Sequence, residues 1–370
     1  MPETDRHWPC DSCGADLRFA PGQTRLICDH CGNVQEIPAA SAESAANLRE
    51  VDLAEGLRAD QNGAQSSGLV EELRSSRCPN CGALVEFRGA SHATQCPFCA
   101  TPVVTGTGTE RQLKPQGLVP FRLNEKQARE AMNRWMGSLW FAPNRLVEYS
   151  RKGRAMNGIY VPYWTFDAAT RSRYSGARGD YYYEIRTVTV NVNGRMEQRQ
   201  EQVRHVRWRP VSGRVGRFFD DILVLASKGL PRGYTDALAP WELSELIPYS
   251  ADYLAGFASE GYTVGLADGQ RIGREDMQRV IAGDVRRDIG GDEQRIQSID
   301  TEYSQQTFKH ILLPVWMAAY KYGGKTYRFV VNGQTGKVKG ERPYSAWKIA
   351  FAILLALLVA GAIAYLQQNR

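Results

Sequence analysis

Cysteine spacing constrains this chain more than any other feature of its sequence. All eight cysteines fall into four Cys-x-x-Cys pairs, and none is left over. The pairs form two quartets with offsets of 0, 3, 18 and 21, and the second quartet repeats the first after 68 residues. Gly14-Ala15 and Phe19 also recur, as Gly82-Ala83 and Phe87. The sequence therefore contains a duplicated small unit, with Cys10, Cys13, Cys28 and Cys31 in the first copy and Cys78, Cys81, Cys96 and Cys99 in the second.

Two Cys-x-x-Cys turns can direct four thiolates at one metal ion, and a tetrahedron of thiolates suits zinc best. The glycine after Cys13, Cys31 and Cys81 lets the backbone bend closely around the sulfurs, and Ala100 takes that place in the fourth turn. A unit of about 22 residues cannot bury a core of its own, so metal binding must supply its folding free energy. We expect two structural zinc ions without an open coordination position. Rubredoxin-like iron and redox dithiols are the alternatives.

The two ends of the chain indicate where it resides. The start, MPETDRHWPC, lacks the apolar segment of a signal peptide, so we expect reduced thiols in the cytosol. The stretch from Ile349 to Leu366 has 18 residues without a charge, which as a helix is ~27 Å long, close to the apolar thickness of a bilayer. Lys337, Lys339, Arg342 and Lys348 precede this stretch and only Arg370 follows it. The positive-inside rule then predicts a single-pass, tail-anchored protein with its N-terminal part in the cytoplasm.

Changes in composition along the chain predict a multidomain protein. We expect two small β zinc ribbons, an α+β, mostly antiparallel β soluble domain and one C-terminal transmembrane helix. The spacer is rich in Ala, Ser and Glu, and a short helix is expected in it around residues 48–57. The predicted boundaries are zinc ribbon 1 at 1–37, a spacer at 38–76, zinc ribbon 2 at 77–104, a linker at 105–112, the α+β domain at 113–345 and the membrane anchor with a short tail at 346–370.

Several local signals predict elements of the α+β domain. Asn124 can cap a helix that carries Ala128, Met132 and Trp135 on one face, and a second helix is expected at 275–289. Asn193-Gly194 and Asn332-Gly333 follow alternating segments and predict hairpins. The stretch GIYVPYW at 158–164 is similar to HILLPVW at 310–316, which indicates two related α-plus-β segments, with two unrelated buried strand starts as the alternative.

Motifs of catalysis are missing from the sequence, and we expect no enzyme and no catalytic residue. The five histidines form no His-Glu-x-x-His motif, and no Gly-x-Ser-x-Gly occurs. The stretch AYKYGGKT at 319–326 lacks the first glycine of a phosphate loop and is typical of a hairpin, so no nucleotide-binding residues are assigned. Asp220-Asp221 could ligate a metal, although adjacent acidic residues usually mark a solvated turn.

Charge argues against nucleic acid as the partner of the cysteine units. The first unit has two arginines against three aspartates, the second has one arginine against one glutamate, and each four-thiolate zinc centre adds about −2. The most basic stretch lies elsewhere, at 195–217, where seven arginines face two glutamates. It could bind anionic lipid or nucleic acid, or it could be the solvated face of a hairpin.

The cysteine units, CDSCG…CDHCG and CPNCGA…CPFCA, resemble zinc ribbons of the transcription factor IIB type and those of primosomal helicases. Taken whole, the chain resembles a bacterial family of membrane-anchored zinc-ribbon proteins, through LVPF, IYVPYW, ILLPVW, FVVNGQTGKVKGERP and the terminal span. Helicase activity is not implied, because ATPase motifs are absent. Relatives resemble factors encoded beside phage-shock-protein-A-like and stomatin/prohibitin-type proteins.

The resemblance implies a scaffold at the bacterial inner membrane. We expect the lipid bilayer and a phage-shock-protein-A-like or stomatin/prohibitin-type protein as partners, with a role in envelope stress. The alternative is a membrane-associated nucleic-acid-binding protein related to replication and the primosome. Ala352, Ala356, Ala360 and Ala364 recur every four residues in the span, so the transmembrane helix is a candidate for homo-oligomer contacts.

Overall fold

The fold was examined in a computed structural model of the whole chain. It describes residues 8–39, 48–62, 69–86, 93–99, 101–104, 109–140, 156–192, 195–322, 325–341 and 345–368.

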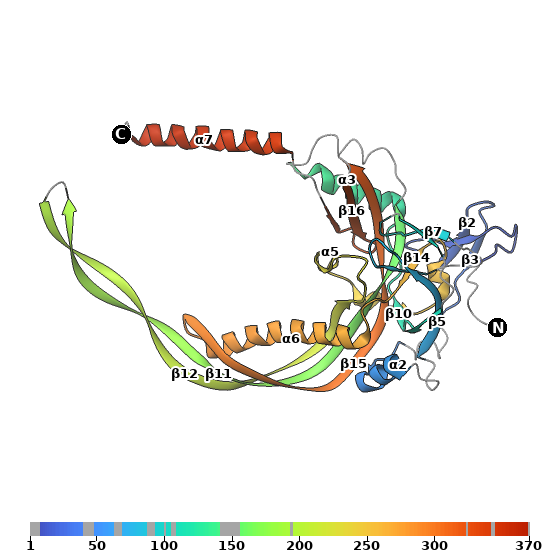
Figure 1. Ribbon diagram of the computed structural model, residues 1–370, viewed down its shortest axis with the longest axis horizontal. Coiled ribbons are helices and arrows are strands. Elements are labelled where there is room, and N and C mark those ends of the chain that lie inside the picture. The colour runs from blue at the N-terminus through green and yellow to red at the C-terminus, as the bar shows by residue number, and fades with distance from the viewer. Residues whose placement is uncertain are drawn as a thin grey trace.

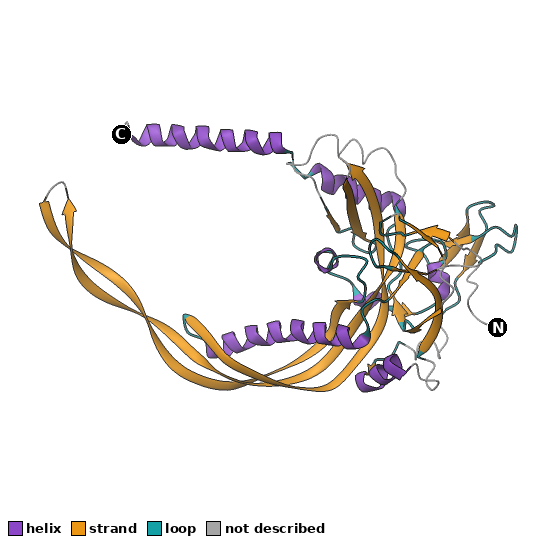
Figure 2. Ribbon diagram, in the orientation of Figure 1, coloured by secondary structure: helices purple, strands orange, loops and turns teal. Residues whose placement is uncertain are grey.

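Strands dominate the described residues (Figure 2). The α-helices are α2 (Leu53–Asn62), α3 (Glu125–Gly137), α5 (Arg232–Asp236), α6 (Leu266–Ile289) and α7 (Ala346–Gln368), with 3-10 helices η1 (Leu243–Glu245) and η2 (Ala251–Leu254). The strands are β1 (Leu17–Phe19), β2 (Arg25–Cys28), β3 (Val34–Glu36), β4 (Val51–Asp52), β5 (Val70–Arg77), β6 (Leu84–Glu86), β7 (Ala93–Gln95), β8 (Pro102–Val104), β9 (Thr109–Leu113), β10 (Gly117–Leu118), β11 (Asn157–Val192), β12 (Arg195–Leu225), β13 (Ile247–Pro248), β14 (Ala258–Gly261), β15 (Glu293–Tyr322), β16 (Lys325–Asn332) and β17 (Val338–Gly340).

One sheet of 12 strands organises the body of the protein. Its main path runs β13-β10-β15-β11-β14-β6-β5-β9, and β4, β12, β16 and β17 branch from it. Most neighbours are antiparallel, but β10 is parallel to β15 and β14 is parallel to β11. The strands β1-β2-β3 form a separate small sheet, and β7 pairs with β8. A mostly antiparallel β fold with helices and a C-terminal apolar helix is therefore confirmed.

Three strands are long enough to leave the body as a curved arm (Figure 1). β11, β12 and β15 have 36, 31 and 30 residues, and β15 stays beside β11 as far as the pair Gly179–Glu293. Beyond that pair, β11 and β12 continue alone as a two-stranded ribbon to Val192 and Arg195. An isolated two-stranded ribbon is marginally stable in water, so this distal ribbon lacks the support that the rest of the sheet has.

Helix α6 covers the concave side of the three-stranded part of the arm (Figure 1). Gly269 and Gly273 allow the close approach, because a Cβ atom at these positions would lie 2.5 Å from Trp164 and 3.0 Å from Phe166. Asp284 forms an ion pair with Arg217 of β12 at 2.6 Å. The buried residues of α6 recur about once per turn, so one face of the helix closes the core over the sheet.

The similar stretches at 158–164 and 310–316 are antiparallel neighbours in the sheet, with Gly158 opposite Trp316 and Trp164 opposite His310. Their partners also match at a shift of 152 residues. β14 pairs with Ile159 and Tyr160, while β10 pairs with Ile311 and Leu312; the pairing with β12 begins at Tyr163, while the pairing with β16 begins at Val315. The two segments therefore share the element order β-α-β-β, as β10-α3-β11-β12 and β14-α6-β15-β16, and are called the two repeats below. The domain boundaries remain a prediction.

Several local predictions can be compared with the fold. Asn124 caps α3 in a reciprocal capping box with Gln127. The helix expected at 275–289 starts earlier, at Leu266, and the helix expected around 48–57 lies at Leu53–Asn62. Antiparallel strands flank 193–194, and antiparallel β15 and β16 likewise flank 323–324; both pairs of residues lie outside the described residues. The turn after Asn332 is longer than Asn-Gly alone, because β17 begins at Val338.

Candidate metal centres and the groove between them

Three of the four cysteine turns have the same backbone geometry. Gly14, Gly32 and Gly82 have φ of +71°, +75° and +76°, a conformation that suits glycine and turns the chain around the metal position. Each of these glycines donates its N–H to the carbonyl of the cysteine four residues earlier, at 2.8, 2.9 and 3.0 Å. The fourth turn has Ala100 at this place, outside the described residues.

The four sulfurs of each set converge. All ligand atoms within a set lie within 4.8 Å of one another, and the pairs Cys10–Cys31 and Cys13–Cys28 both have Sγ–Sγ distances of 3.6 Å. In the second set the corresponding distances are 3.5 and 3.6 Å. A tetrahedron with metal–sulfur bonds of about 2.3 Å has edges of about 3.8 Å, whereas a disulfide measures about 2.05 Å. The geometry therefore supports two metal centres formed by all eight predicted cysteines.

Backbone N–H groups reach the first sulfur of every turn, but the pKa shifts of the eight thiols go in both directions. The pKa is lowered at Cys10, Cys28, Cys81 and Cys99 and raised at Cys13, Cys31, Cys78 and Cys96. Burial raises the pKa of Cys10, but N–H donors from Ser12 and Cys13 outweigh it and lower the pKa to about 6. Interaction with the Cys96 thiol is the main cause that lowers the pKa of Cys81, to about 5. In all four turns the first sulfur accepts N–H groups from the residues two and three positions later, namely Ser12 and Cys13, His30 and Cys31, Asn80 and Cys81, and Phe98 and Cys99.

The first cysteine module, residues 8–39, packs directly on the body. The backbone N–H of Phe19 donates to the carbonyl of Ala255 at 3.0 Å, and the Phe19 ring lies 5.1 Å from that of Tyr253. Gly22 donates its N–H to the carbonyl of Phe121 at 2.9 Å. Cys10, Cys28 and Phe19 are part of one buried cluster with the body. The module is therefore held against the body through η2 and the segment that follows β10.

The second cysteine module, the described part of residues 77–104, enters the main sheet. β6 pairs with β14, with Val85 opposite Glu260 and Leu84 opposite Gly261. Strands β6, β7 and β8 of this module correspond to β1, β2 and β3 of the first. β7 pairs with β8 as β2 pairs with β3. β1 pairs with β2, but among the described residues β6 pairs with β5 and β14 and not with β7. The duplication thus kept the metal site and changed the partner of the first strand.

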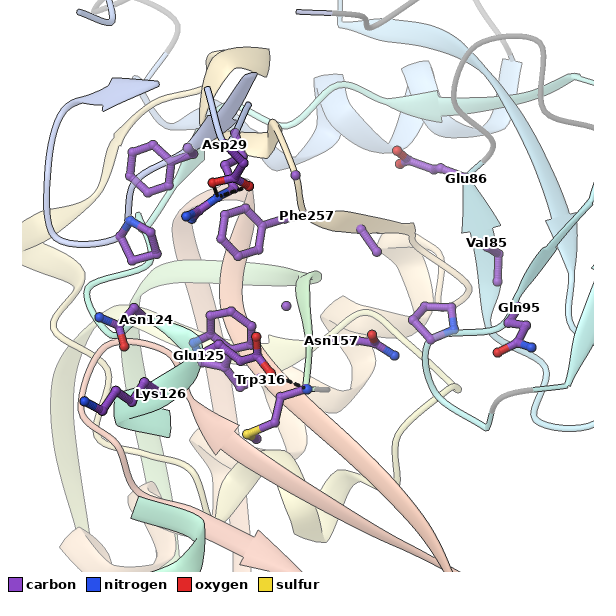
Figure 3. Close-up of a pocket in the computed structure, with 18 residues that line it drawn as sticks. Asp29, Val85, Glu86, Gln95, Asn124, Glu125, Lys126, Asn157, Phe257 and Trp316 are labelled. Atoms are coloured by element: carbon purple, nitrogen blue, oxygen red, sulfur yellow. Dashed lines mark hydrogen bonds and ion pairs between the residues drawn. The ribbon is translucent and has the colours of Figure 1, made fainter. Parts of the chain in front are cut away.

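A groove of about 1000 Å³ lies between the two modules (Figure 3). Phe257 and Trp316 provide apolar surface in it, and Asn157 adds an amide. Arg18 and Asp29 form an ion pair at 2.6 Å on the side of the first module. The lining residues come from both modules, the start of α3, the start of β11, β14 with its flank, and β15: Arg18, Phe19, Pro21, Asp29, Val85, Glu86, Gln95, Pro97, Asn124, Glu125, Lys126, Met156, Asn157, Gly158, Gly256, Phe257, Ala258 and Trp316.

A third cluster of side chains was missed by sequence reasoning. Glu50, Asp167 and Asp220 place carboxylate oxygens within 4.8 Å of one another. Lys309 lies among them, with Nζ 3.2 Å from Glu50 Oε1 and 3.0 Å from Asp221 Oδ1. Burial raises the pKa of Asp167 to about 6. The Lys309 ammonium forms ion pairs with several carboxylates, so the cluster is an ion-pair network. This network connects the segment before β4 to the sheet. In the sequence, only the adjacent Asp220 and Asp221 signalled it.

The arginines of the basic stretch at 195–217 whose side chains the structure describes do not form a single patch. Strand alternation places Arg199, Arg207, Arg209 and Arg217 on one face of β12, and Arg204 and Arg214 on the other. Arg209 is paired with Asp180 at 2.6 Å, Arg217 is paired with Asp284, and Arg204 lies 4.3 Å from the centre of the Tyr181 ring. These partners reduce the positive field that phosphates would require.

Helix α7 contains a candidate membrane span, Trp347–Gln367, which is long and apolar enough to cross a bilayer and has no buried residue. The helix projects from the body (Figure 1). An exposed apolar helix of this length is unfavourable in water, which supports its burial in lipid.

These features define a class of protein: a β-rich body that carries two four-cysteine centres and ends in an exposed apolar helix. The chain is 25% identical over 366 residues to the uncharacterized protein YdjG of Bacillus subtilis (strain 168), an alignment that covers 93% of this chain and 92% of that protein. No family model matches the chain, and no solved structure is similar to it.

Proposed function

We propose that the protein is a non-enzymatic scaffold, anchored in the bacterial inner membrane by α7, that recruits a protein partner to the cytoplasmic face. The observation that carries the proposal is the groove, because its walls are built from both cysteine modules and it belongs to a body that ends in an exposed apolar helix. In this proposal both modules are zinc ribbons, and the zinc ion in each one stabilises its fold. A partner segment in the groove would contact both modules at once, so recruitment would depend on the metal.

The chemistry of the two sites favours zinc over iron. Four thiolates in a tetrahedron leave no position for substrate, and zinc provides stability without redox activity. The envelope-stress partners expected from the family resemblance, phage-shock-protein-A-like or stomatin/prohibitin-type proteins, are the proposed occupants of the groove. Nucleic acid is less well supported, because the arginines of β12 lie on two faces and several have protein partners.

Metal analysis of the purified full chain tests the first part of the proposal. We expect two equivalents of zinc and no visible absorption from iron–thiolate charge transfer. Cys78→Ser should release one equivalent and leave the other, because the two sets share no ligand. A wild-type content below two, or an iron spectrum, would contradict this part.

Site-specific crosslinking tests recruitment. A photoreactive amino acid at Asn157, exposed in the groove, should capture a membrane or peripheral protein in intact cells. The same amino acid at Glu275, exposed on α6, is the matched control. The capture at Asn157 should fall when Cys78→Ser removes one metal. Crosslinks to nucleic acid at Asn157 in place of protein would favour the alternative function.

Topology can be measured separately. With the N-terminal part in the cytoplasm, protease added outside intact spheroplasts should leave residues 1–345 undigested. Digestion of the cysteine modules under these conditions would reverse the orientation.

A further inference from the structure

The distal ribbon of the arm has an open edge. β12 pairs with β11 along its whole length, and no other described strand pairs with β12. Among the described strands, none adds a third to the ribbon beyond Gly179, and Tyr183, Ile185 and Met196 are exposed by 57%, 66% and 74%. An exposed edge of this length offers unpaired N–H and C=O groups to another strand.

Pro210 shows which residues of β12 direct their backbone groups toward this edge. It lies opposite Ala177, and proline has no N–H, so the pair is of the type that exchanges no hydrogen bonds between β11 and β12. The register continues without a shift from this pair to the tip of the arm. By alternation, Gln198, Gln200 and Gln202 therefore present their N–H and C=O groups to the open edge.

The side chains along this part of the edge are self-complementary. The segment 198–202 reads Gln-Arg-Gln-Glu-Gln, and all five side chains are exposed. If two such strands run antiparallel with Gln200 opposite Gln200, Arg199 of each copy stands opposite Glu201 of the other, and Gln198 stands opposite Gln202. The charged residues then occupy the non-hydrogen-bonded pairs, in which side chains approach most closely.

No ion pair within 4 Å joins Arg199 or Glu201 to another described side chain, although Arg186 of β11 stands opposite Glu201 in the strand register. The other edge of the ribbon offers less. Glu184 of β11 already lies 3.6 Å from Arg186 of the same strand and 3.3 Å from His205.

From these observations we infer that two copies of the chain associate through antiparallel pairing of the β12 edges around Gln200. The interface is isologous, with a two-fold axis through the Gln200 pair, and it joins the two distal ribbons into a four-stranded sheet. The added strands supply the support that an isolated ribbon lacks. This surface is separate from the cysteine modules and from α7.

The test measures self-association of the full-length, metal-loaded chain in detergent micelles by analytical ultracentrifugation. Wild type should be dimeric. Arg199→Glu places glutamates opposite each other, and Glu201→Arg does the same with arginines, so each variant should weaken association by at least about tenfold.

Complementation then separates a lost interface from a misfolded arm. Mixing the R199E and E201R variants should restore a heterodimer, because the two glutamates of one copy then face the two arginines of the other. The double variant R199E/E201R should associate with itself like wild type. Both recoveries require the pairing centred on Gln200, since another register would not bring positions 199 and 201 together.

Two controls identify the competing interfaces. E184Q/R186Q neutralises the corresponding charges on β11, and A356L/A360L enlarges small residues in α7; both should leave the dimer intact. A monomeric wild type, or failure of the mixed variants to associate, would overturn the inference. So would a dimer that is lost in one of these two control variants and kept in both R199E and E201R.

Discussion

Trp164 and Trp316 make the same hydrogen bond at equivalent places in the fold. Trp164 donates its indole N–H to the carbonyl of Val264 at 2.9 Å, and Trp316 donates to the carbonyl of Leu123 at 2.8 Å. Each carbonyl lies two residues before a helix, α6 for Val264 and α3 for Leu123. Each tryptophan belongs to the strand of one repeat and binds the helix start of the other. The two repeats therefore interlock.

Loss of either indole N–H should destabilise the body. Trp164→Phe and Trp316→Phe each remove a buried hydrogen bond and part of a packed ring, and we expect the free energy of unfolding to fall by about 1–3 kcal/mol in both variants. Denaturant titration of the full chain checks this. Trp140→Phe is the control, because Trp140 is 75% exposed and its replacement should change the stability little. A large loss at only one of the two positions would contradict their equivalence.

Two glycines of α6 should respond in opposite directions to the same change. Gly269→Ala places a Cβ atom 2.5 Å from Trp164, so the helix must shift away from the sheet and the unfolding temperature should fall. Gly283→Ala meets no atom within 4 Å and should stabilise the helix by up to about 1 kcal/mol through its higher helix propensity. Thermal unfolding of the two variants beside wild type makes the comparison. Equal behaviour would mean that α6 does not pack on Trp164 as described.

Metal removal should affect the two modules unequally. β6 of the second module pairs with β14 inside the main sheet, whereas β1-β2-β3 form a sheet of their own. We therefore expect Cys78→Ser to lower the unfolding temperature of the body more than Cys13→Ser does. Tryptophan fluorescence during heating reports the body, while metal analysis verifies that each variant has lost one ion. The reverse order would indicate that the contacts of Phe19 with the body matter more than the β6–β14 pairing.

Features that depend on residues close together in the sequence could be predicted from it. Cysteine spacing located both four-sulfur sets, Asn124 located a helix start, and the repeated Pro-x-Trp pattern located the two central strands. In each case the signal and the structure lie within a few residues of each other, so propensity and spacing suffice.

Long-range pairing was not predictable in the same way. β6 and β14 are more than 170 residues apart, and only the complete sheet brings Val85 opposite Glu260. The length of the arm was also missed, because alternation alone does not show whether three strands run together. The position of Lys309 within the acidic cluster was also not predicted, because the strand register decides which side chains share a face.

His310 should make the fold sensitive to mild acid. The ring is buried, its Nδ1 lies 2.8 Å from the carbonyl of Leu113, and its Nε2 has no partner in the described part of the chain. The contact with Leu113 assigns the proton to Nδ1, so the folded protein holds a neutral imidazole. Burial lowers the pKa of His310 to about 4, against an ordinary value of about 6.5.

The sign of the effect follows from proton binding. Between about pH 6.5 and pH 4 the unfolded chain holds a proton on His310 that the folded chain does not, so stability is present above this window and is lost as the pH falls through it. The contribution is about 1.4 kcal/mol per pH unit, or on the order of 3 kcal/mol across the window. His310→Asn keeps an N–H near the Leu113 carbonyl and does not titrate. We expect this variant to be less stable than wild type at pH 7, where it loses ring contacts with Trp164, yet to lose less stability between pH 7 and pH 4.5. Denaturant titrations at both pH values measure the difference, and every other titrating group is common to both proteins. Parallel pH profiles for the two proteins would contradict the prediction, because they would show that the pKa of His310 is the same in the folded and the unfolded chain.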